Sequence, residues 1–239
     1  MKLNSKLETK EMLFQRYVYE YIDTNMYILV EREQHKALVI DPNISEKALM
    51  YLKEQGVREI LILLTHEHYD HTNGVNYFYE QFESRLCCQE WAAKSIGIEK
   101  NNRPLLEALH LKMAGEQEKL NKMRVEYKPY RCKADVIFDK ELEMAWCGHT
   151  IKLIYTPGHS KGSCCIEVDG QYVFTGDSLI PDVKVITRFP GGDEELYVQK
   201  TLPYLYSISE DVWIMPGHRT PVKKCNLEYK EEIFCMIKK

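Results

Sequence analysis

From Ile60 to His71 the chain reads ILILLTHEHYDH, an apolar run followed at once by three histidines and an aspartate. The run is continuous, apolar and short, which is typical of a buried strand. The metal-ligating residues that follow it are His66, His68, Asp70 and His71. Neutral imidazole and carboxylate are ligands that first-row divalent metal ions accept. The stretch therefore predicts a strand that ends in a metal-binding loop.

Three further residues of these types each follow an apolar segment and a glycine-bearing turn. His159 and His218 lie in Pro-Gly-His turns, and Asp177 lies in a Thr-Gly-Asp-Ser turn. The segments before them predict strands and cover residues 151–155, 164–174 and 212–215. Glycine lets the backbone turn sharply and brings the ligand close to a site. The sequence thus repeats one pattern: a strand, a turn and a metal-ligating side chain.

This set of seven residues resembles the metal-binding motif of the metallo-β-lactamase superfamily, and specifically of its glyoxalase II-like hydrolases. The resemblance runs from about Leu13 to His218 and implies that family's α/β fold, the αββα four-layer sandwich. The implied ligands of a first metal ion are His66, His68 and His159. The implied ligands of a second metal ion are Asp70, His71 and His218, with Asp177 bridging the two ions.

The resemblance also implies a reaction, that of a binuclear metal-dependent hydrolase. Zinc lowers the pKa of a bound water from about 15.7 to near 7, so a hydroxide shared by two ions attacks the carbonyl of a thioester, ester or lactone. We expect Asp70 and Asp177 to be catalytic: Asp70 orients the hydroxide, and Asp177 supplies the charge that holds two cations together. The expected cofactors are two divalent metal ions, with zinc first and iron or manganese also accepted by these ligands.

The composition limits the partners. The chain has 239 residues, 44% of them hydrophobic and 28% charged, which is ordinary for a soluble globular protein. Its net charge of −4 argues against nucleic-acid binding. No apolar run reaches the about 18 residues of a membrane span, and residues 1–10 show no signal peptide. Eight cysteines without a Cys-x-x-Cys motif favour free thiols and a cytoplasmic setting. We expect a small-molecule substrate; the oligomeric state stays open.

We expect a single domain over residues 1–239, whose two halves, roughly 1–130 and 131–239, each contribute ligands. Residues 45–55 predict a helix. Residues 36–40, 134–138 and 141–146 predict strands, the last two paired as a hairpin.

Residues 97–131 predict a helical insertion, with Asn102 as a helix cap. One face of its first helix would be apolar and carry Leu105, Leu106, Leu109 and Met113. Residues 110–133 hold seven Lys or Arg against three Glu. The insertion is either a lid that attracts an anionic substrate or a packed insertion with a solvated basic face.

Other residues are weaker candidates. Lys184, Arg188 and His110 are candidate substrate contacts, the first two because they could hold an anion. In the resembling family an Asp-Pro such as Asp41-Pro42 supports the metal loop, although a plain strand-ending turn is an equal interpretation. Glu67 and Tyr69 lie between ligands and are expected to be structural.

Several alternatives remain. The Lys-x-Tyr pair and the C-terminal helical domain with which glyoxalase II enzymes bind glutathione are not evident, so a glutathione thioester is in doubt. His71 and Asp177 argue against a β-lactamase proper, and a lactonase fits the same chemistry. A persulfide dioxygenase would use one iron ion, held by His66, His159 and Asp177. A non-catalytic binding module would be expected to have lost ligands, and none is missing.

Overall fold

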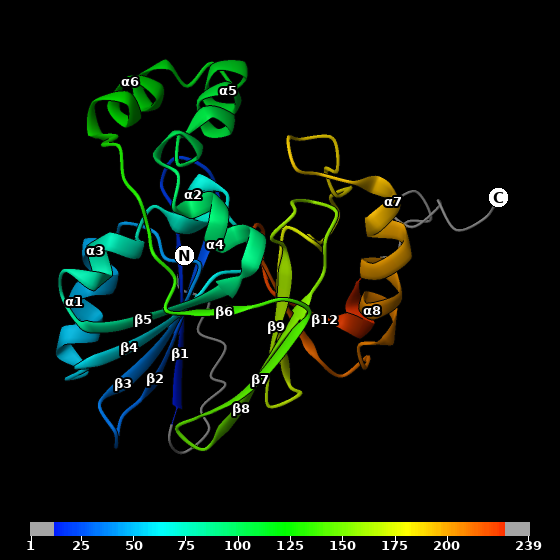
Figure 1. Cartoon of the computed structure of the whole chain (residues 1–239). Coiled ribbons are helices and arrows are strands. Elements are labelled where there is room, and N and C mark those ends of the chain that lie inside the picture. Colours follow the sequence, from blue (N-terminus) through cyan, green and yellow to red (C-terminus); the bar gives the residue numbers. More distant parts are fainter. Residues whose placement is uncertain (1–11, 228–239) are drawn as a thin grey trace. The chain divides into compact units, whose positions relative to one another are not determined.

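The computed structural model describes residues 12–227. Within this range the strands form two sheets of six strands each, in the orders β1-β2-β3-β4-β5-β6 and β12-β11-β10-β9-β8-β7 (Figure 1). The first sheet contains β1 (Met12–Val18), β2 (Asn25–Glu31), β3 (Lys36–Ile40), β4 (Glu59–Leu63), β5 (Glu83–Gln89) and β6 (Val136–Phe138). The second contains β7 (Glu141–Trp146), β8 (His149–Tyr155), β9 (Cys164–Val168), β10 (Tyr172–Gly176), β11 (Trp213–Pro216) and β12 (Val222–Lys223). The predictions on residues 1–10 and on Cys235 lie outside the described range.

The described chain divides into two compact units. Unit 1 comprises residues 12–63, 68–86 and 94–135, and unit 2 comprises residues 64–67, 87–93 and 136–227. Both sheets are mixed, because β3 pairs with β4 and β10 pairs with β11 in parallel, whereas β1 and β2, and β8 and β9, pair antiparallel. The metal-loop segment therefore begins in unit 2 and continues in unit 1.

In unit 1 the core is built on two strands that are buried along most of their length. Every residue of β2 is buried, and β3 is buried from Ala37 onward, as expected for apolar strands covered on both faces. The helices are α1 (Glu46–Glu54), α2 (Tyr69–Thr72), α3 (Val75–Tyr79), α5 (Leu105–Met113), α6 (Gln117–Glu126) and the short η1 (Glu99–Asn101). Helix α4 (Glu90–Ile96) contains residues of both units. In Figure 1, α1 and α3 lie beside the strands of unit 1, and α5 and α6 lie beyond one end of them.

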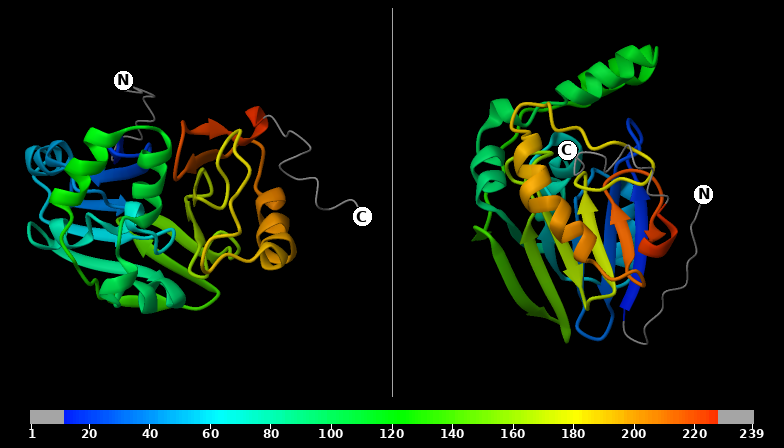
Figure 2. Two further views of the ribbon diagram at one scale, coloured as in Figure 1. Left: turned by 90° about the horizontal axis from the view of Figure 1, so that it is seen from above. Right: turned by 90° about the vertical axis from the view of Figure 1, so that its right-hand side faces the viewer.

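In unit 2 a helical segment covers the sheet. It consists of α7 (Glu194–Leu196), the π-helical turn η2 (Tyr197–Thr201) and α8 (Leu202–Ser207); the short η3 (Lys224–Asn226) follows β12. The right-hand view of Figure 2 shows this segment running alongside the strands. Tyr197, Leu202 and Leu205 pack in one buried cluster with strand residues such as Val173 and Ile214. The crossover between β10 and β11 is therefore fixed against the sheet that carries the ligand turns.

Most predicted elements are confirmed, with differences in detail. The strand at residues 36–40 and the strand at residues 141–146 have the expected bounds. Ser45 caps α1, since its side chain accepts a hydrogen bond from the Ala48 N–H group. β6 does not pair with β7 as a hairpin, which was our expectation; it pairs in parallel with β5.

The insertion is helical, but the expectation about its helix cap is wrong. Asn102 does not cap α5; its side chain donates hydrogen bonds to the carbonyls of Ile96 and Tyr130, at 2.8 and 2.9 Å. The face that is apolar in the sequence is largely exposed, at 67% for Leu105 and 81% for Met113. The buried face of α5 instead carries Glu107 and Leu111. No helix among residues 12–227 has both the length and the apolar character to cross a bilayer.

Candidate metal centre

The first of the predicted metal ligands lie in the loop that follows β4. The Leu64 N–H group donates to the Cys87 carbonyl at 3.2 Å, and the Cys164 N–H group donates to the Thr65 carbonyl at 2.7 Å. These two bonds attach the start of the loop to β5 and β9 within unit 2. His66 follows directly and is only 1% exposed. The backbone therefore fixes the position of its imidazole.

Thr65 is packed against the turn that carries Asp177. Gly176 has a φ of +49°, and a Cβ atom at this position would lie 2.3 Å from Thr65 Oγ1. Any side chain there would collide with Thr65, and the left-handed backbone favours glycine as well. Thr65 Oγ1 also lies 3.1 Å from His66 Nδ1. One threonine thus links the turns of two predicted ligands.

His159 lies in the turn after β8 and is buried. Its Nδ1 atom lies 2.9 Å from the Ile186 carbonyl oxygen. A carbonyl can only accept a hydrogen bond, so Nδ1 must carry the proton and Nε2 presents a lone pair. The His159 ring also lies edge to face with the His66 ring, at 5.0 Å between centroids. This tautomer is the one that a metal ligand bound through Nε2 requires.

Asp177 and His218 follow two strands that pair in parallel, β10 and β11. The carboxyl ends of parallel strands lie at the same edge of a sheet, so the two turns meet there. Asp177 Oδ2 lies 3.5 Å from His159 Nε2 and 3.5 Å from His218 Nε2. Unit 2 therefore places one carboxylate oxygen between two imidazole nitrogens.

Unit 1 carries Asp70 and His71 in the four-residue helix α2, and His68 immediately before it. His71 is fully buried; its Nε2 atom lies 3.3 Å from Asp70 Oδ2, and its Nδ1 atom lies 2.9 Å from Asp41 Oδ2. The Thr24 hydroxyl donates to Asp70 Oδ2 at 2.6 Å. Asp41 thus orients His71, the supporting role that the family resemblance implied for it.

Electrostatics around His71 favour its charged form when no metal ion is bound. Burial lowers the pKa of His71, but the carboxylates of Asp70 and Asp41 raise it, and the net pKa lies well above the ordinary value. A cation at this position would replace the proton as the charge that balances two carboxylates.

Two structural contacts near the ligands were not evident from the sequence. The Ser160 hydroxyl donates to Glu67 Oε2 at 2.8 Å, which ties the metal loop to the His159 turn; burial raises the pKa of Glu67. The Tyr197 hydroxyl donates to the Ser178 carbonyl at 2.8 Å, next to Asp177. The Tyr197 side chain also fills the space beside Gly158. Tyrosines are common in this chain, so no pattern marked Tyr197.

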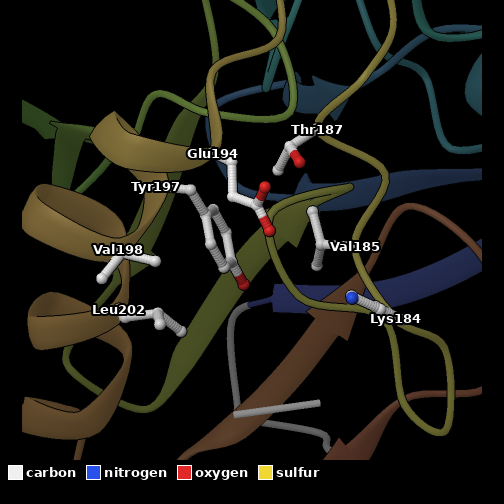
Figure 3. Close-up of a pocket in the computed structure, with 7 residues that line it drawn as sticks. All are labelled: Lys184, Val185, Thr187, Glu194, Tyr197, Val198 and Leu202. Atoms are coloured by element: carbon white, nitrogen blue, oxygen red, sulfur yellow. The ribbon is translucent and has the colours of Figure 1, made fainter. Parts of the chain in front are cut away.

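The three candidate substrate contacts are exposed side chains. Lys184 is exposed and lines a pocket in unit 2 together with Thr187 and Glu194; Figure 3 shows these side chains facing Tyr197 and Val185. Arg188 is exposed on the same segment, and His110 is exposed on α5. Neither Arg188 nor His110 is among the residues that line this pocket.

The residues fit a metal ion by their chemistry. All seven predicted ligands belong to clusters of histidine and aspartate that could hold one. The nitrogen and oxygen atoms are those that zinc, iron and manganese accept, and the hydrogen bonds to His71 and His159 leave Nε2 of both for coordination. Imidazole and carboxylate groups gathered in this way are the ligand types of a metal-binding site.

The chain belongs to the metallo-β-lactamase superfamily, whose family description matches residues 22–205. A Bacillus subtilis protein named "Probable metallo-hydrolase YqgX" is 27% identical over 82% of this chain and 85% of its own length. The Haemophilus influenzae protein named hydroxyacylglutathione hydrolase GloC is 25% identical, over 80% of this chain and 83% of its own. The Bacillus velezensis protein named "Probable polyketide biosynthesis zinc-dependent hydrolase BaeB" is also 25% identical, over 89% and 82%.

Solved structures show the same fold. The BLEG-1 B3 metallo-β-lactamase has a TM-score of 0.69 at 24% identity and covers 89% of this chain and 95% of its own. TTHA1623 in a di-iron-bound form has a TM-score of 0.64 at 23% identity and covers 90% and 96%. The predicted family and the predicted αββα fold class are confirmed, and the chain is a metal-binding hydrolase of this superfamily.

Proposed function

We propose that this chain is a binuclear hydrolase that cleaves a thioester, ester or lactone of a small anionic substrate. Its first metal ion would be held by His66, His68 and His159, and its second by Asp70, His71 and His218. Asp177 would bridge the two ions. This assignment follows the family pattern, and each unit supports its own share of the ligands.

The observation that carries the proposal is the position of Asp177 Oδ2, 3.5 Å from the Nε2 atoms of His159 and His218. The Ile186 carbonyl holds the proton of His159 on Nδ1, so in the neutral ring a lone pair on Nε2 faces a carboxylate oxygen. Two electron-rich atoms repel each other unless a cation lies between them. A carboxylate that faces two imidazoles in this way is suited to hold more than one ion.

When bound, such ions lower the pKa of a coordinated water to near 7 and supply hydroxide at neutral pH. The residues of the chain fix where this happens. Thr24 donates to Asp70 and thereby orients its carboxylate, which we assign to orienting the attacking water. Asp41 holds His71 through Nδ1. Both contacts are preorganised, since they link buried side chains of unit 1.

The names of two relatives and the charge of the insertion support the substrate class. GloC is named as a hydroxyacylglutathione hydrolase, and BaeB as a zinc-dependent hydrolase of polyketide biosynthesis. An anionic substrate is supported by the basic residues of the helical insertion, although several of them are paired. Lys119 forms an ion pair with Glu116, and Lys122 with Glu20.

The test is to measure metal identity and stoichiometry in protein purified without added metal, and then hydrolysis of thioesters, esters and lactones. About two ions per chain, with hydrolysis that is lost on chelation and regained with zinc, would support the proposal. A single tightly held iron ion, together with oxygen consumption in the presence of a persulfide, would contradict it and favour a dioxygenase.

A further inference from the structure

The side chain of Glu67 contacts the turn that carries His159. In the sequence, Glu67 lies between two predicted ligands, His66 and His68. The Ser160 hydroxyl donates to Glu67 Oε2 at 2.8 Å, although the two residues are 93 positions apart. The carboxylate of Glu67 thus joins the loop of two predicted ligands to the turn of a third.

The hydrogen bonds around Ser160 run in one direction. An ionised carboxylate only accepts hydrogen bonds, so the proton of the Ser160 hydroxyl points toward Glu67. The Ser163 hydroxyl oxygen lies 2.8 Å from that of Ser160 and must therefore donate to it. Ser163 Oγ in turn accepts from the Ser160 N–H group at 3.1 Å. Both serines are buried, and a buried polar network in which each proton has an acceptor is rigid.

The backbone at Gly162 leaves room for the Glu67 carboxylate. A Cβ atom at Gly162 would lie 2.5 Å from Glu67 Oε2 and 2.5 Å from the Ala92 nitrogen. Only a residue without a side chain permits neighbours this close. The backbone of the turn, as well as the hydrogen bond, therefore restricts the position of this carboxylate within unit 2.

Two hydrogen bonds join the loop of His66 to the segment of His159, one on each side of His66. The Thr65 carbonyl accepts from the Cys164 N–H group at 2.7 Å, and the Glu67 carboxylate accepts from the serine that follows His159. The rings of His66 and His159 lie edge to face, with centroids 5.0 Å apart. Two imidazoles that bind one zinc ion need a fixed separation, because each nitrogen must lie about 2.0–2.1 Å from the metal.

We propose that Glu67 is a positioning residue that holds the imidazoles of His66 and His159 at the separation that the first metal ion requires. It would act through Ser160 and not as a ligand, because the groups of described residues that could hold an ion do not include Glu67. This inference rests on the proposed function, which assigns both imidazoles to one ion.

The experiment compares zinc retention by the full-length protein and by Glu67→Ala, which removes the acceptor. Both are loaded with zinc, titrated with a chelator and assayed for bound zinc per chain. We expect the variant to release one ion at about 10-fold lower free chelator, the lower end of the effect of an orienting partner, because the backbone bond of Cys164 remains. The other ion should be retained as in the wild type. Glu143→Ala, at an exposed position on β7 in the same unit, removes the same charge and should match the wild type.

Two further variants separate positioning from a general loss of stability. Glu67→Gln keeps an oxygen that accepts from Ser160, so it should retain zinc better than Glu67→Ala. Ser160→Ala breaks the same hydrogen bond from the other side, and it decides the question if Glu67→Ala does not fold. If the two residues act through one bond, the double variant should lose no more affinity than either single variant.

Diffraction at the zinc absorption edge, from Glu67→Ala crystals with one ion left, should place that ion at the ligands proposed for the second site. Unchanged retention in both single variants, an equal loss of both ions, or a remaining ion at His66 and His159 would overturn the inference. A wild type that binds only one ion would instead contradict the proposed binuclear centre. Retention of that single ion by Glu67→Ala and Ser160→Ala would then test the role of Glu67 by itself.

Discussion

The two units hold their predicted metal ligands by different means. In unit 2 the ligands follow strand ends, and the backbone fixes them: Asp177 and His218 end parallel strands, and a main-chain carbonyl orients His159. In unit 1 the predicted ligands Asp70 and His71 lie on a four-residue helix, directly after His68, and buried side chains hold both of them. Asp41 contacts His71 there, and Thr24 contacts Asp70.

This difference determines which substitutions the predicted ligands of each unit tolerate. A backbone-held ligand depends on sheet pairing and on tight turns, so an added Cβ atom damages it more than the loss of a neighbouring polar group. A ligand held by side chains depends on the charge and hydrogen bonds of its neighbours, which a single isosteric substitution can remove. The four predictions below test this contrast.

The largest effect should come from Asp177→Ala, which removes the proposed bridge. Both ions should be lost, with a fall in zinc affinity greater than the about 10–100-fold that loss of an outer partner costs. Hydrolysis should fall to background. Zinc per chain after dialysis measures this, with Asp211→Ala at an exposed position as the control. Retention of two ions would exclude the bridging role.

Gly158→Ala should be the most damaging change to the backbone of unit 2. Gly158 has a φ of +132°, and a Cβ atom there would lie 2.3 Å from Tyr197 Cβ and 2.8 Å from its Cα. We expect a loss of about 1–3 kcal/mol from overpacking, plus about 1–3 kcal/mol from the strained φ, measured by urea unfolding. Gly170 also has a positive φ, of +62°, but a Cβ atom there would have no neighbouring atom within 4 Å. Gly170→Ala is therefore the control for a positive φ without a collision. Equal losses in both variants would show that Tyr197 does not constrain the turn.

In unit 1, Asp41→Asn should weaken binding of the second ion without unfolding the protein. Asparagine can still accept a hydrogen bond from His71 Nδ1, but the negative charge that increases the basicity of the imidazole is gone. We expect a loss in zinc affinity of about 10–100-fold, measured by competition with a chelator. Asp182→Asn is the matched control, because Asp182 also has a positive φ but lies at an exposed position in unit 2. An unchanged competition curve would mean that Asp41 has only a structural role.

Tyr197→Phe should have the smallest effect of the four. It removes the hydrogen bond to the Ser178 carbonyl but keeps the ring that packs against Gly158. We expect a loss of stability of about 1 kcal/mol in urea unfolding and little change in zinc affinity, since the backbone still holds Asp177. Tyr206→Phe, at an exposed position on α8, should be neutral. A large loss of zinc would show that the turn depends on this hydroxyl.

Much of the fold could be predicted from local patterns. Apolar runs located β4, β8 and β11. The run at residues 164–174, predicted as one strand, is divided between the antiparallel strands β9 and β10. β5 was not predicted, since its first half is partly exposed and its buried half contains two cysteines rather than β-branched residues. The pairing of β6 was predicted wrongly, because a short strand next to a turn resembles half of a hairpin.

The candidate ligand residues, like much of the fold, could be predicted from the sequence. The seven residues were indicated by their spacing, and within unit 2 the structure brings Asp177 close to His159 and His218. Their roles as ligands stay a prediction. The burial of Glu107 could not be predicted from periodicity, because it depends on how α5 packs against the rest of unit 1. Helical periodicity identified an apolar face on α5, but the fold buries the opposite one.

The parallel pairing of β10 and β11 has a consequence for the time at which the site forms. His218 is 41 positions after Asp177, which corresponds to about 2–8 s of synthesis at about 5–20 residues per second. Until β11 is made and paired, Asp177 lacks the imidazole that its sheet edge will supply. The predicted ligand set is therefore complete only late in synthesis, and the proposed metal ions would be acquired after β11 has formed.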